Sequence, residues 1–432
     1  QVENEYGSFG SDKAYLNYLR DLWRSGLGNG VVIHSTDGPE SPQMLDGSRV
    51  PGVLQTVDFG YQSNAAASFT LLRESQALVT PPGGELLPVM NSEYYTGSLV
   101  FWGDKHFPVP YNVTLVAEGL DKLLDSKSAS GAAFNPSFTL WLFAGVTDFG
   151  FTGGSVAGRW LVPSYDFGAA VDEAGGVRPL FFALREVLRR HGAQIPAGSL
   201  PTPPPCTSFG KVQLNQQVSL FDALTALAPF PVSSPTVLTM EEMGLGFGYA
   251  LYHTIVPEPQ ADAEDTDISV SGLRDRALLL WNGEVRKLCN DDVCTNASTL
   301  HTHPDISNPH LRSDKQRGLN RQAQRMPQQQ RQLSLLVENM GRATYGSGTV
   351  GLEWTGVSQW VSASGQVLSN WTITPLQLEN ASEALKSLWQ PVQQRPQTSP
   401  TFFRGVFQID AGRLADTFLS VVGWQKGQAF IN

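Results

Sequence analysis

The stretch Leu87-Pro88-Val89-Met90-Asn91-Ser92-Glu93-Tyr94-Tyr95-Thr96-Gly97 begins as a short apolar run and ends in polar residues. Short apolar runs of this kind are typical of strands buried on both faces of a parallel sheet. Similar runs lie at residues 31–37, 53–59 and 138–144, and segments with helical spacing of apolar residues lie at 12–24, 65–76, 114–124 and 180–190. The alternation of strands and helices predicts a parallel α/β architecture for the first 190 residues.

The first predicted helix, residues 12–24, has apolar residues at helical spacing. Ser11 is the expected N-cap, and Gly26 is expected to end the helix.

Acidic residues follow the predicted strands. In a (β/α)8 barrel the carboxyl ends of the strands form the catalytic face. Five carboxylates are therefore expected at one edge: Glu5, Asp37, Asp58, Glu93 and Asp148. Loop capping is the simpler interpretation of Asp37 and Asp58.

Two of these carboxylates lie in similar polar surroundings, Glu5 in residues 1–7 (QVENEYG) and Glu93 in residues 91–97 (NSEYYTG). A glycosidase needs such a pair. One carboxylic acid protonates the departing oxygen, and a second carboxylate attacks or stabilises the anomeric carbon. The pair therefore makes glycoside hydrolysis the first hypothesis.

These two segments resemble the signatures of family-35 glycoside hydrolases, the acid β-galactosidases. The resemblance continues in the same order through residues 36–39 (TDGP), 56–60 (TVDFG), 164–166 (SYD), 275–277 (DRA), 336–342 (LVENMGR) and 423–428 (GWQKGQ). It implies that Glu5 is the acid/base, Glu93 the nucleophile, Asn4 a ligand of a sugar hydroxyl, and Tyr95 a hydrogen-bonding neighbour of Glu93. The alternatives are a core aromatic role for Tyr95 and a turn role for Asn4. No cofactor and no metal are expected.

The chain departs from the family pattern around the expected sugar pocket. Ser98 stands where the family usually has Trp, and Trp141 replaces a sugar-facing Tyr. Phe167 and Gly168 replace a phenol and a carboxylate. Trp141 and Phe167 are still expected on the substrate side, where an aromatic face suits the C–H side of a sugar. The resemblance supports the chemistry better than it supports galactose specificity.

Three functions follow from this comparison. The first is a retaining exo-β-galactosidase acting on terminal β-galactosyl glycans. The second is a β-glycosidase of altered sugar preference. The third is a homologue that binds glycans without hydrolysing them, although such a protein has no need of both carboxylates.

The expected fold class is α/β followed by β. Residues 1–195 are expected to form the second half of a (β/α)8 TIM barrel, and 196–209 a Pro-rich linker. Residues 210–369 are expected to form a jelly-roll-like β-sandwich, and 370–432 the start of a second, galactose-binding-like one. The resemblance implies that the first barrel strands and the end of the last domain are missing. Such a fragment is expected to be poorly stable and inactive alone.

Residues 290–332 combine many Gln and Arg residues with few apolar ones, which predicts a disordered insertion. Its histidines and cysteines, His301, His303, Cys289 and Cys294, do not have the spacing of an ordinary zinc site. Cys289 and Cys294 are close enough in sequence to pair, which would leave Cys206 over.

The net charge of −10 argues against a nucleic-acid partner. No apolar run approaches the roughly 20 residues that span a membrane. Sequons at Asn112, Asn296, Asn370 and Asn380 suit a secretory-pathway protein, so a lysosomal, vacuolar or secreted location is expected, with any signal peptide upstream. The sequence does not determine the oligomeric state, and a homodimer is one assembly that it allows.

Overall fold

The computed structural model describes residues 1–104, 112–196, 198, 200, 205–228, 230–257, 266–289, 298–301, 331–345, 354–394, 397–409, 412, 415–424 and 426–431. The chain divides into two compact units, Gln1–Asp148 with Leu161–Pro203, and Phe149–Trp160 with Pro204–Asn432. Most of the insertion predicted at 290–332 lies outside the described residues, as do the side chains of its cysteines and histidines.

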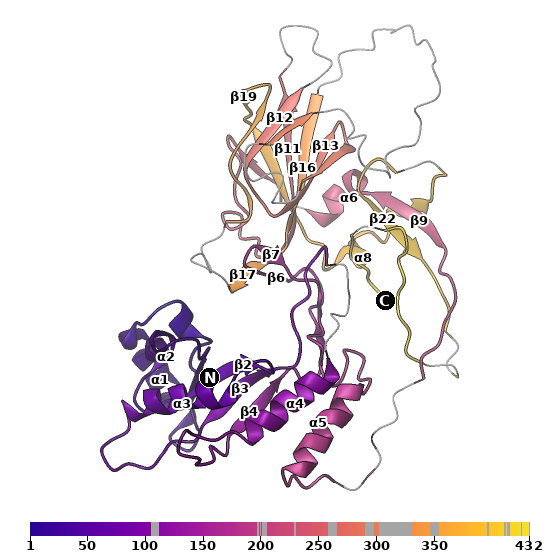
Figure 1. Ribbon diagram of the computed structural model, residues 1–432. Coiled ribbons are helices and arrows are strands. Elements are labelled where there is room, and N and C mark those ends of the chain that lie inside the picture. The colour runs from indigo at the N-terminus through magenta and orange to yellow at the C-terminus, as the bar shows by residue number, and fades with distance from the viewer. Residues whose placement is uncertain are drawn as a thin grey trace, which may run out of the picture. The chain divides into compact units, whose positions relative to one another are not determined.

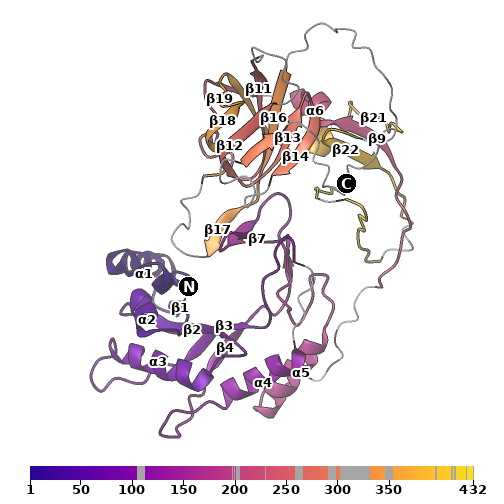
Figure 2. The ribbon, with the colours of Figure 1, turned by 45° about the horizontal axis from the view of Figure 1, so that its top comes forward.

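A parallel sheet forms the centre of the first unit (Figures 1 and 2). Its four strands are hydrogen-bonded in sequence order: β1 (His34–Asp37), β2 (Leu54–Gly60), β3 (Met90–Tyr95) and β4 (Ser137–Trp141). The N-terminal segment runs beside β1, because Val2 N donates to His34 O at 2.8 Å and Glu5 N donates to Thr36 O at 3.0 Å. The carboxyl ends of these strands, and Glu5 with them, therefore lie at one edge of the sheet. The described strands do not close into a barrel.

Helices separate the strands in the chain. Their bounds are α1 (Lys13–Leu27), α2 (Pro42–Ser48), α3 (Ala65–Ala77), α4 (Val113–Leu124) and α5 (Pro179–Arg190). Asn64 and Asn112 cap α3 and α4 by accepting hydrogen bonds from the first-turn amides Ala67 N and Leu115 N. Each βα step thus has a local start signal in the sequence.

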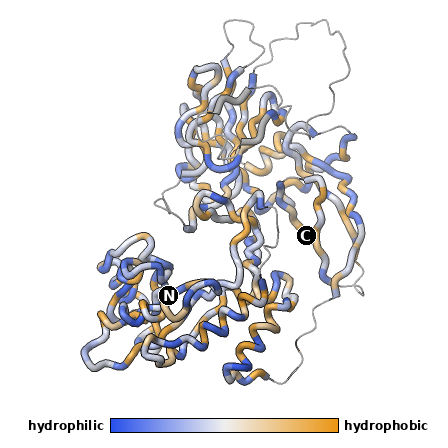
Figure 3. The backbone as a smooth tube through the Cα atoms, in the orientation of Figure 1, coloured by the Kyte–Doolittle hydropathy of each residue, from blue (hydrophilic) through white to orange (hydrophobic). Residues whose placement is uncertain are grey.

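The apolar faces of α2, α3, α4 and α5 pack on the sheet as one core. Phe69, Leu72, Leu120 and Leu180 are fully buried there together with Val57 of β2. Polar and apolar segments alternate along α4 and α5 in Figure 3, as expected for helices with one buried face.

Several predicted boundaries need correction. Asp12 caps α1 in place of Ser11, accepting from Ala14 N and Tyr15 N, and the helix continues past Gly26 to Leu27. Strand β1 begins at His34 instead of residue 31, and β3 begins at Met90 instead of residue 87. An apolar run marks the approach to the sheet here, whereas the ladder itself consists of polar residues.

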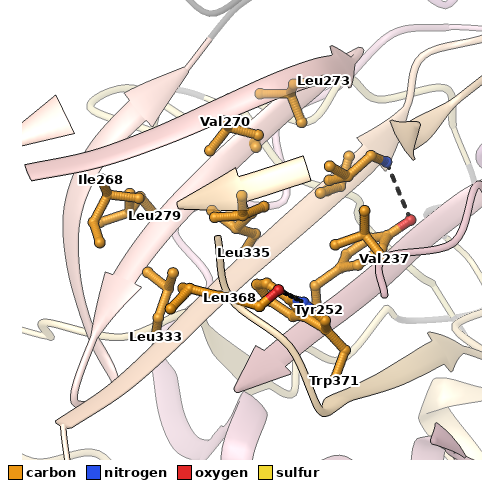
Figure 4. Packing of buried hydrophobic residues seen from close by; sticks show 14 of the residues in the cluster. Val237, Tyr252, Ile268, Val270, Leu273, Leu279, Leu333, Leu335, Leu368 and Trp371 are labelled. Atoms are coloured by element: carbon orange, nitrogen blue, oxygen red, sulfur yellow. Dashed lines mark hydrogen bonds between the residues drawn. The ribbon is translucent and has the colours of Figure 1, made fainter. Parts of the chain in front are cut away.

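The second unit contains a β-sandwich. A six-stranded sheet has the order β10 (Val232–Ser234), β20 (Trp371–Leu376), β11 (Gly248–Val256), β16 (Arg331–Asn339), β13 (Arg276–Trp281) and β14 (Glu284–Cys289). The facing sheet has the order β15 (Ser298–His301), β12 (Asp267–Arg274), β18 (Gly356–Ala363) and β19 (Gln366–Val367). Inward-facing side chains of both sheets form one core around the buried Tyr252 and Trp371 (Figure 4). Both large polar aromatics have hydrogen-bond partners, since Tyr252 donates to Leu238 O and Trp371 to Leu368 O.

Shorter elements complete the two units. A three-stranded sheet of β21 (Gln390–Pro391), β9 (Leu214–Ser219) and β22 (Thr401–Gly405) shares a second core with α6 (Leu220–Leu227) and α8 (Ala381–Ala384). A further sheet joins β17 (Arg342–Tyr345), β6 (Gly154–Val156) and β7 (Arg159–Trp160), whereas β5 (Val146–Thr147) pairs with β8 (Ser164–Tyr165) in the first unit.

Candidate active site

Two buried carboxylates lie side by side on the neighbouring strands β2 and β3. Asp58 is the register partner of Glu93, and the exposed fractions of these residues are only 4% and 7%. The ladders on both sides of β3 shift register beside these residues. Such irregularities re-aim side chains and are common next to active sites.

A tight turn after the N-terminal segment places Glu5 at the same edge. Glu5 has a left-handed φ of 47°, and the 3-10 helix η1 (Tyr6–Ser8) follows it directly. Asp37 caps this turn by accepting from Gly7 N at 2.7 Å. A Cβ at Gly7 would lie 1.8 Å from Met44 O, so the turn needs glycine there. For Asp37, the loop-capping interpretation matches its contacts.

The Tyr95 hydroxyl joins the carboxylates. It lies 2.7 Å from Asp58 Oδ2 and 3.2 Å from Glu5 Oε1. A phenol has one proton to donate, and the shorter distance assigns it to Asp58 in this arrangement. Burial and the charge of Asp58 raise the pKa of Glu93, and a hydrogen bond with Tyr95 offsets part of that rise. Glu5 and Asp58 precede Tyr95 in the chain by 90 and 37 positions, and both contact its hydroxyl group.

The electrostatics of the cluster favour bound protons. Burial, the charge of Asp58 and a hydrogen bond with Asp58 raise the pKa of Glu5 to about 8, and the charge of Glu93 adds to the effect. Burial and the charge of Asp58 raise the pKa of Glu93 to about 7. Desolvation and like charges both disfavour the ionised form of a carboxyl group. Both carboxyl groups therefore keep a proton to higher pH than a free glutamate does.

Buried hydroxyl groups on the strands form hydrogen bonds with one another and with Asp58. Thr36 Oγ1 donates to Asp58 Oδ1 at 3.3 Å and is hydrogen-bonded to Ser92 Oγ. Thr56 Oγ1 lies 2.9 Å from Ser92 Oγ and 2.7 Å from Ser35 O. Buried polar groups are tolerated when they are hydrogen-bonded to one another. This network fixes the strands that carry Asp58 and Glu93.

Aromatic rings flank the cluster. The Phe167 ring stacks on Tyr165 at a centroid distance of 5.8 Å and packs against Tyr95 at 6.1 Å. Burial raises the pKa of the Tyr165 phenol, and a side-chain hydrogen bond with the half-buried Trp141 offsets part of this rise. A Cβ at Gly97 would lie 2.0 Å from Phe167 O, so the end of β3 fits directly against this turn. Phe167 thereby supports the Tyr95 ring from the side.

An ion pair anchors the turn that carries Phe167. Both Asp166 carboxylate oxygens accept hydrogen bonds from the Arg178 guanidinium at 2.6 Å, and the Asp166 side chain is only 5% exposed. Bidentate pairs of this kind have strong geometric specificity.

Removing the cation of this pair is expected to destabilise the first unit. Arg178→Met leaves a buried, uncompensated carboxylate, and we expect the free energy of unfolding to fall by about 3–5 kcal/mol. Urea unfolding followed by tryptophan fluorescence measures the change. The double variant Asp166→Asn/Arg178→Met is the control and is expected to lose less stability, because no buried charge remains. Equal losses in both variants would contradict this explanation.

The structure brings together three of the residues predicted to form the site: Glu5, Glu93 and Tyr95. Asn4 is exposed, and its Oδ1 accepts from Gln1 Nε2 at 2.8 Å. Asp58 lies among the three, at the edge where the sequence predicts it, although loop capping is the simpler interpretation of it from sequence alone. The sequence signal for Asp58 is its place in the 56–60 segment, which resembles the family pattern. Its contact with Tyr95 depends on the register of β2 and β3, which the sequence does not show.

No helix in the described part of the chain is long and apolar enough to cross a membrane. Among the same residues, no group of three or more His, Cys, Asp or Glu side chains is arranged to hold a metal ion.

Comparison with known proteins yields three family models along the chain. Residues 1–191 match glycosyl hydrolases family 35, residues 237–308 and 309–377 match the first all-beta domain of beta-galactosidase, and residues 400–432 match its galactose-binding domain. Beta-galactosidases of Bos taurus and Canis lupus familiaris are 32% and 33% identical to it over 449 residues, and the Mus musculus beta-galactosidase-1-like protein is 32% identical over 446. Each alignment covers 100% of this chain and 60–61% of the relative. The chain thus spans about 60% of the length of the curated relatives that it matches.

Proposed function

The chain belongs to glycosyl hydrolases family 35, and on this premise we propose that the protein containing it is a retaining exo-β-galactosidase. It would hydrolyse terminal β-D-galactosyl residues of glycoconjugates or oligosaccharides. The observation that carries the proposal is the meeting of Glu5 and Glu93 around the Tyr95 hydroxyl at the carboxyl edge of a parallel sheet. The sheet itself is proposed to be the second half of a (β/α)8 barrel, followed by β-sandwich domains.

The proposed reaction has two displacements. In the first, the Glu93 carboxylate attacks the anomeric carbon while Glu5 donates its proton to the departing glycosidic oxygen. In the second, Glu5 takes a proton from water, the water oxygen bonds to the anomeric carbon, and the bond to Glu93 breaks. Two inversions leave the anomeric configuration unchanged. The raised pKa of Glu5 supports its proposed role as the acid, because the group keeps its proton where a free glutamate has lost it.

We propose that the residues that bind the sugar lie in the same region of the first unit. Asn4 would hydrogen-bond a hydroxyl of the galactosyl ring, Tyr95 would orient the carboxylates, and Trp141 would offer an apolar face to the C–H side of the sugar. Phe167 would contribute an apolar surface beside Tyr95. No metal or cofactor takes part in this scheme.

One observation favours a second candidate, a β-glycosidase of altered sugar preference. The Phe167 ring lies between Tyr95 and Tyr165 and has no polar atom with which to bind a sugar hydroxyl. A site that hydrogen-bonds a hydroxyl discriminates strongly between sugars, and the loss of one such group costs about 1–3 kcal/mol of that discrimination. Trp141 likewise lacks the phenol hydroxyl of the tyrosine it replaces.

Release of a chromophore from an aryl β-galactoside by the full-length protein tests the proposed function, with aryl β-glucoside and β-fucoside as comparisons. Preference for the galactoside, with a β-configured first product by NMR, would support the retaining galactosidase. Preference for another glycoside would support the second candidate. Binding of galactosides without turnover would overturn both and favour a non-catalytic glycan-binding protein.

Terminal β-galactosyl glycans are the proposed partners, and a homodimer is the proposed assembly. A lysosomal, vacuolar or secreted location is proposed as well. Three predicted sequon asparagines, Asn112, Asn370 and Asn380, are exposed, as glycosylation would require.

A further inference from the structure

Asp58 is the one carboxylate of the cluster for which the two-displacement scheme has no use. It is 4% exposed, so water does not solvate its charge freely. Burying a carboxylate beside two others is costly, and such a group is tolerated only where it is well hydrogen-bonded. Its position therefore calls for an explanation within the site.

The contacts of Asp58 are divided between its two oxygens. Oδ1 lies 3.3 Å from Thr36 Oγ1, which belongs to the hydroxyl network inside the sheet. Oδ2 lies 2.7 Å from the Tyr95 hydroxyl, which in turn lies 3.2 Å from Glu5 Oε1. One oxygen is thus fixed to the scaffold and the other holds the phenol that links the catalytic pair.

We propose that Asp58 is a positioning residue that holds the Tyr95 hydroxyl between Glu5 and Glu93 and sets the protonation of Glu5. The inference rests on the proposed function of the same site. When Tyr95 donates to Asp58, its oxygen is free to accept, so a protonated Glu5 finds acceptors and is kept in place until substrate arrives.

The charge of Asp58 supports the same role. It raises the pKa of both Glu5 and Glu93, and it acts on Glu5 through a hydrogen bond as well. The other titratable groups coupled to Asp58 are Tyr95 and Asp37, and Asp58 raises the pKa of each. Removal of this charge would favour ionised Glu5, and the acid would lose its proton at lower pH.

Asp58→Asn in the full-length protein tests the proposal, since the amide removes the charge and keeps an oxygen that can accept from Tyr95, while its NH2 group takes the place of the oxygen that accepts from Thr36. The basic limb of the pH profile of kcat/KM for an aryl β-galactoside is expected to move to lower pH by about one to two units. Asp58→Ser, which is smaller and keeps a hydroxyl, gives the same test if the Asn variant does not fold. An unmoved basic limb would overturn the proposal.

A double-mutant cycle separates positioning from a merely structural effect. If Asp58 acts through Tyr95, the losses in kcat caused by Asp58→Ala and Tyr95→Phe are strongly non-additive, whereas additive losses contradict this link. A readout without turnover distinguishes this inference from the proposed function. The Glu5 carboxyl is titrated by NMR in 13C-glutamate-labelled protein, with Glu5→Gln for assignment. A lower pKa in Asp58→Asn supports the role even if no glycoside is hydrolysed, and an unchanged pKa overturns it.

Discussion

Glu93→Gln in the full-length protein is expected to lower kcat/KM for an aryl β-galactoside by about 10⁴-fold or more, because no other group can form the glycosyl-enzyme. The amide has nearly the volume of the carboxylate, so the sheet should keep its register around Asp58 and Tyr95. The fall in kcat/KM would therefore reflect the missing nucleophile and not a change in the fold. Initial rates of chromophore release measure it directly.

Chemical rescue identifies the nucleophile more sharply than loss of activity does. In Glu93→Gly, azide can occupy the space of the lost carboxylate and attack the anomeric carbon once, which gives an α-galactosyl azide. NMR of the product distinguishes this single inversion from retention. Glu186→Gln is the matched control for Glu93→Gln. Glu186 lies on α5, where it pairs with Arg189 at the surface, and its substitution is expected to leave activity unchanged. A β-azide from Glu93→Gly, or full activity in Glu93→Gln, would remove Glu93 from the proposed role.

The elements of the first unit were largely predictable because each has a local cause. Helices α3, α4 and α5 lie within one residue of their predicted limits, since asparagine caps or an initial proline mark their starts. The strand starts at β1 and β3 were harder, because apolar residues before the ladder look the same as those within it. The predicted domain boundaries stay predictions.

The site was predictable as a set of residue types but not as a geometry. The sequence segments point to Glu5, Glu93 and Tyr95, yet nothing local indicates that Tyr95 is closest to Asp58. That contact requires the parallel register of β2 and β3 and the shift between Val57 and Asp58. Long-range pairings of this kind are fixed by the fold as a whole. The contact that gives Asp58 its proposed role therefore becomes visible only once the strands are in place.

Glu5→Gln is expected to have an effect that depends on the leaving group. A poor leaving group, such as the alkoxide of an alkyl β-galactoside, needs a proton as the glycosidic bond breaks. Its hydrolysis should therefore slow by about 10²–10⁴-fold. A dinitrophenolate leaves without assistance, so formation of the glycosyl-enzyme from a dinitrophenyl β-galactoside should be far less affected. Stopped-flow measurement of the first turnover separates this step from the later hydrolysis.

The pH profile of the same variant tests the electrostatics of the cluster. Burial and the neighbouring carboxylates raise the pKa of Glu5, and the acid must be protonated in the first step. Wild-type activity should therefore fall as the pH rises through the Glu5 pKa. Glutamine has no proton to lose over this range, so the basic limb should disappear from the profile of Glu5→Gln. The acidic limb, which would report ionisation of Glu93, should stay nearly in place, because Glu5 is protonated and uncharged in the form of the site that starts the reaction, so glutamine removes no charge there. A basic limb that persists unchanged in Glu5→Gln would assign the acid to another residue, and an equal slowing of activated and unactivated substrates would give Glu5 a structural role.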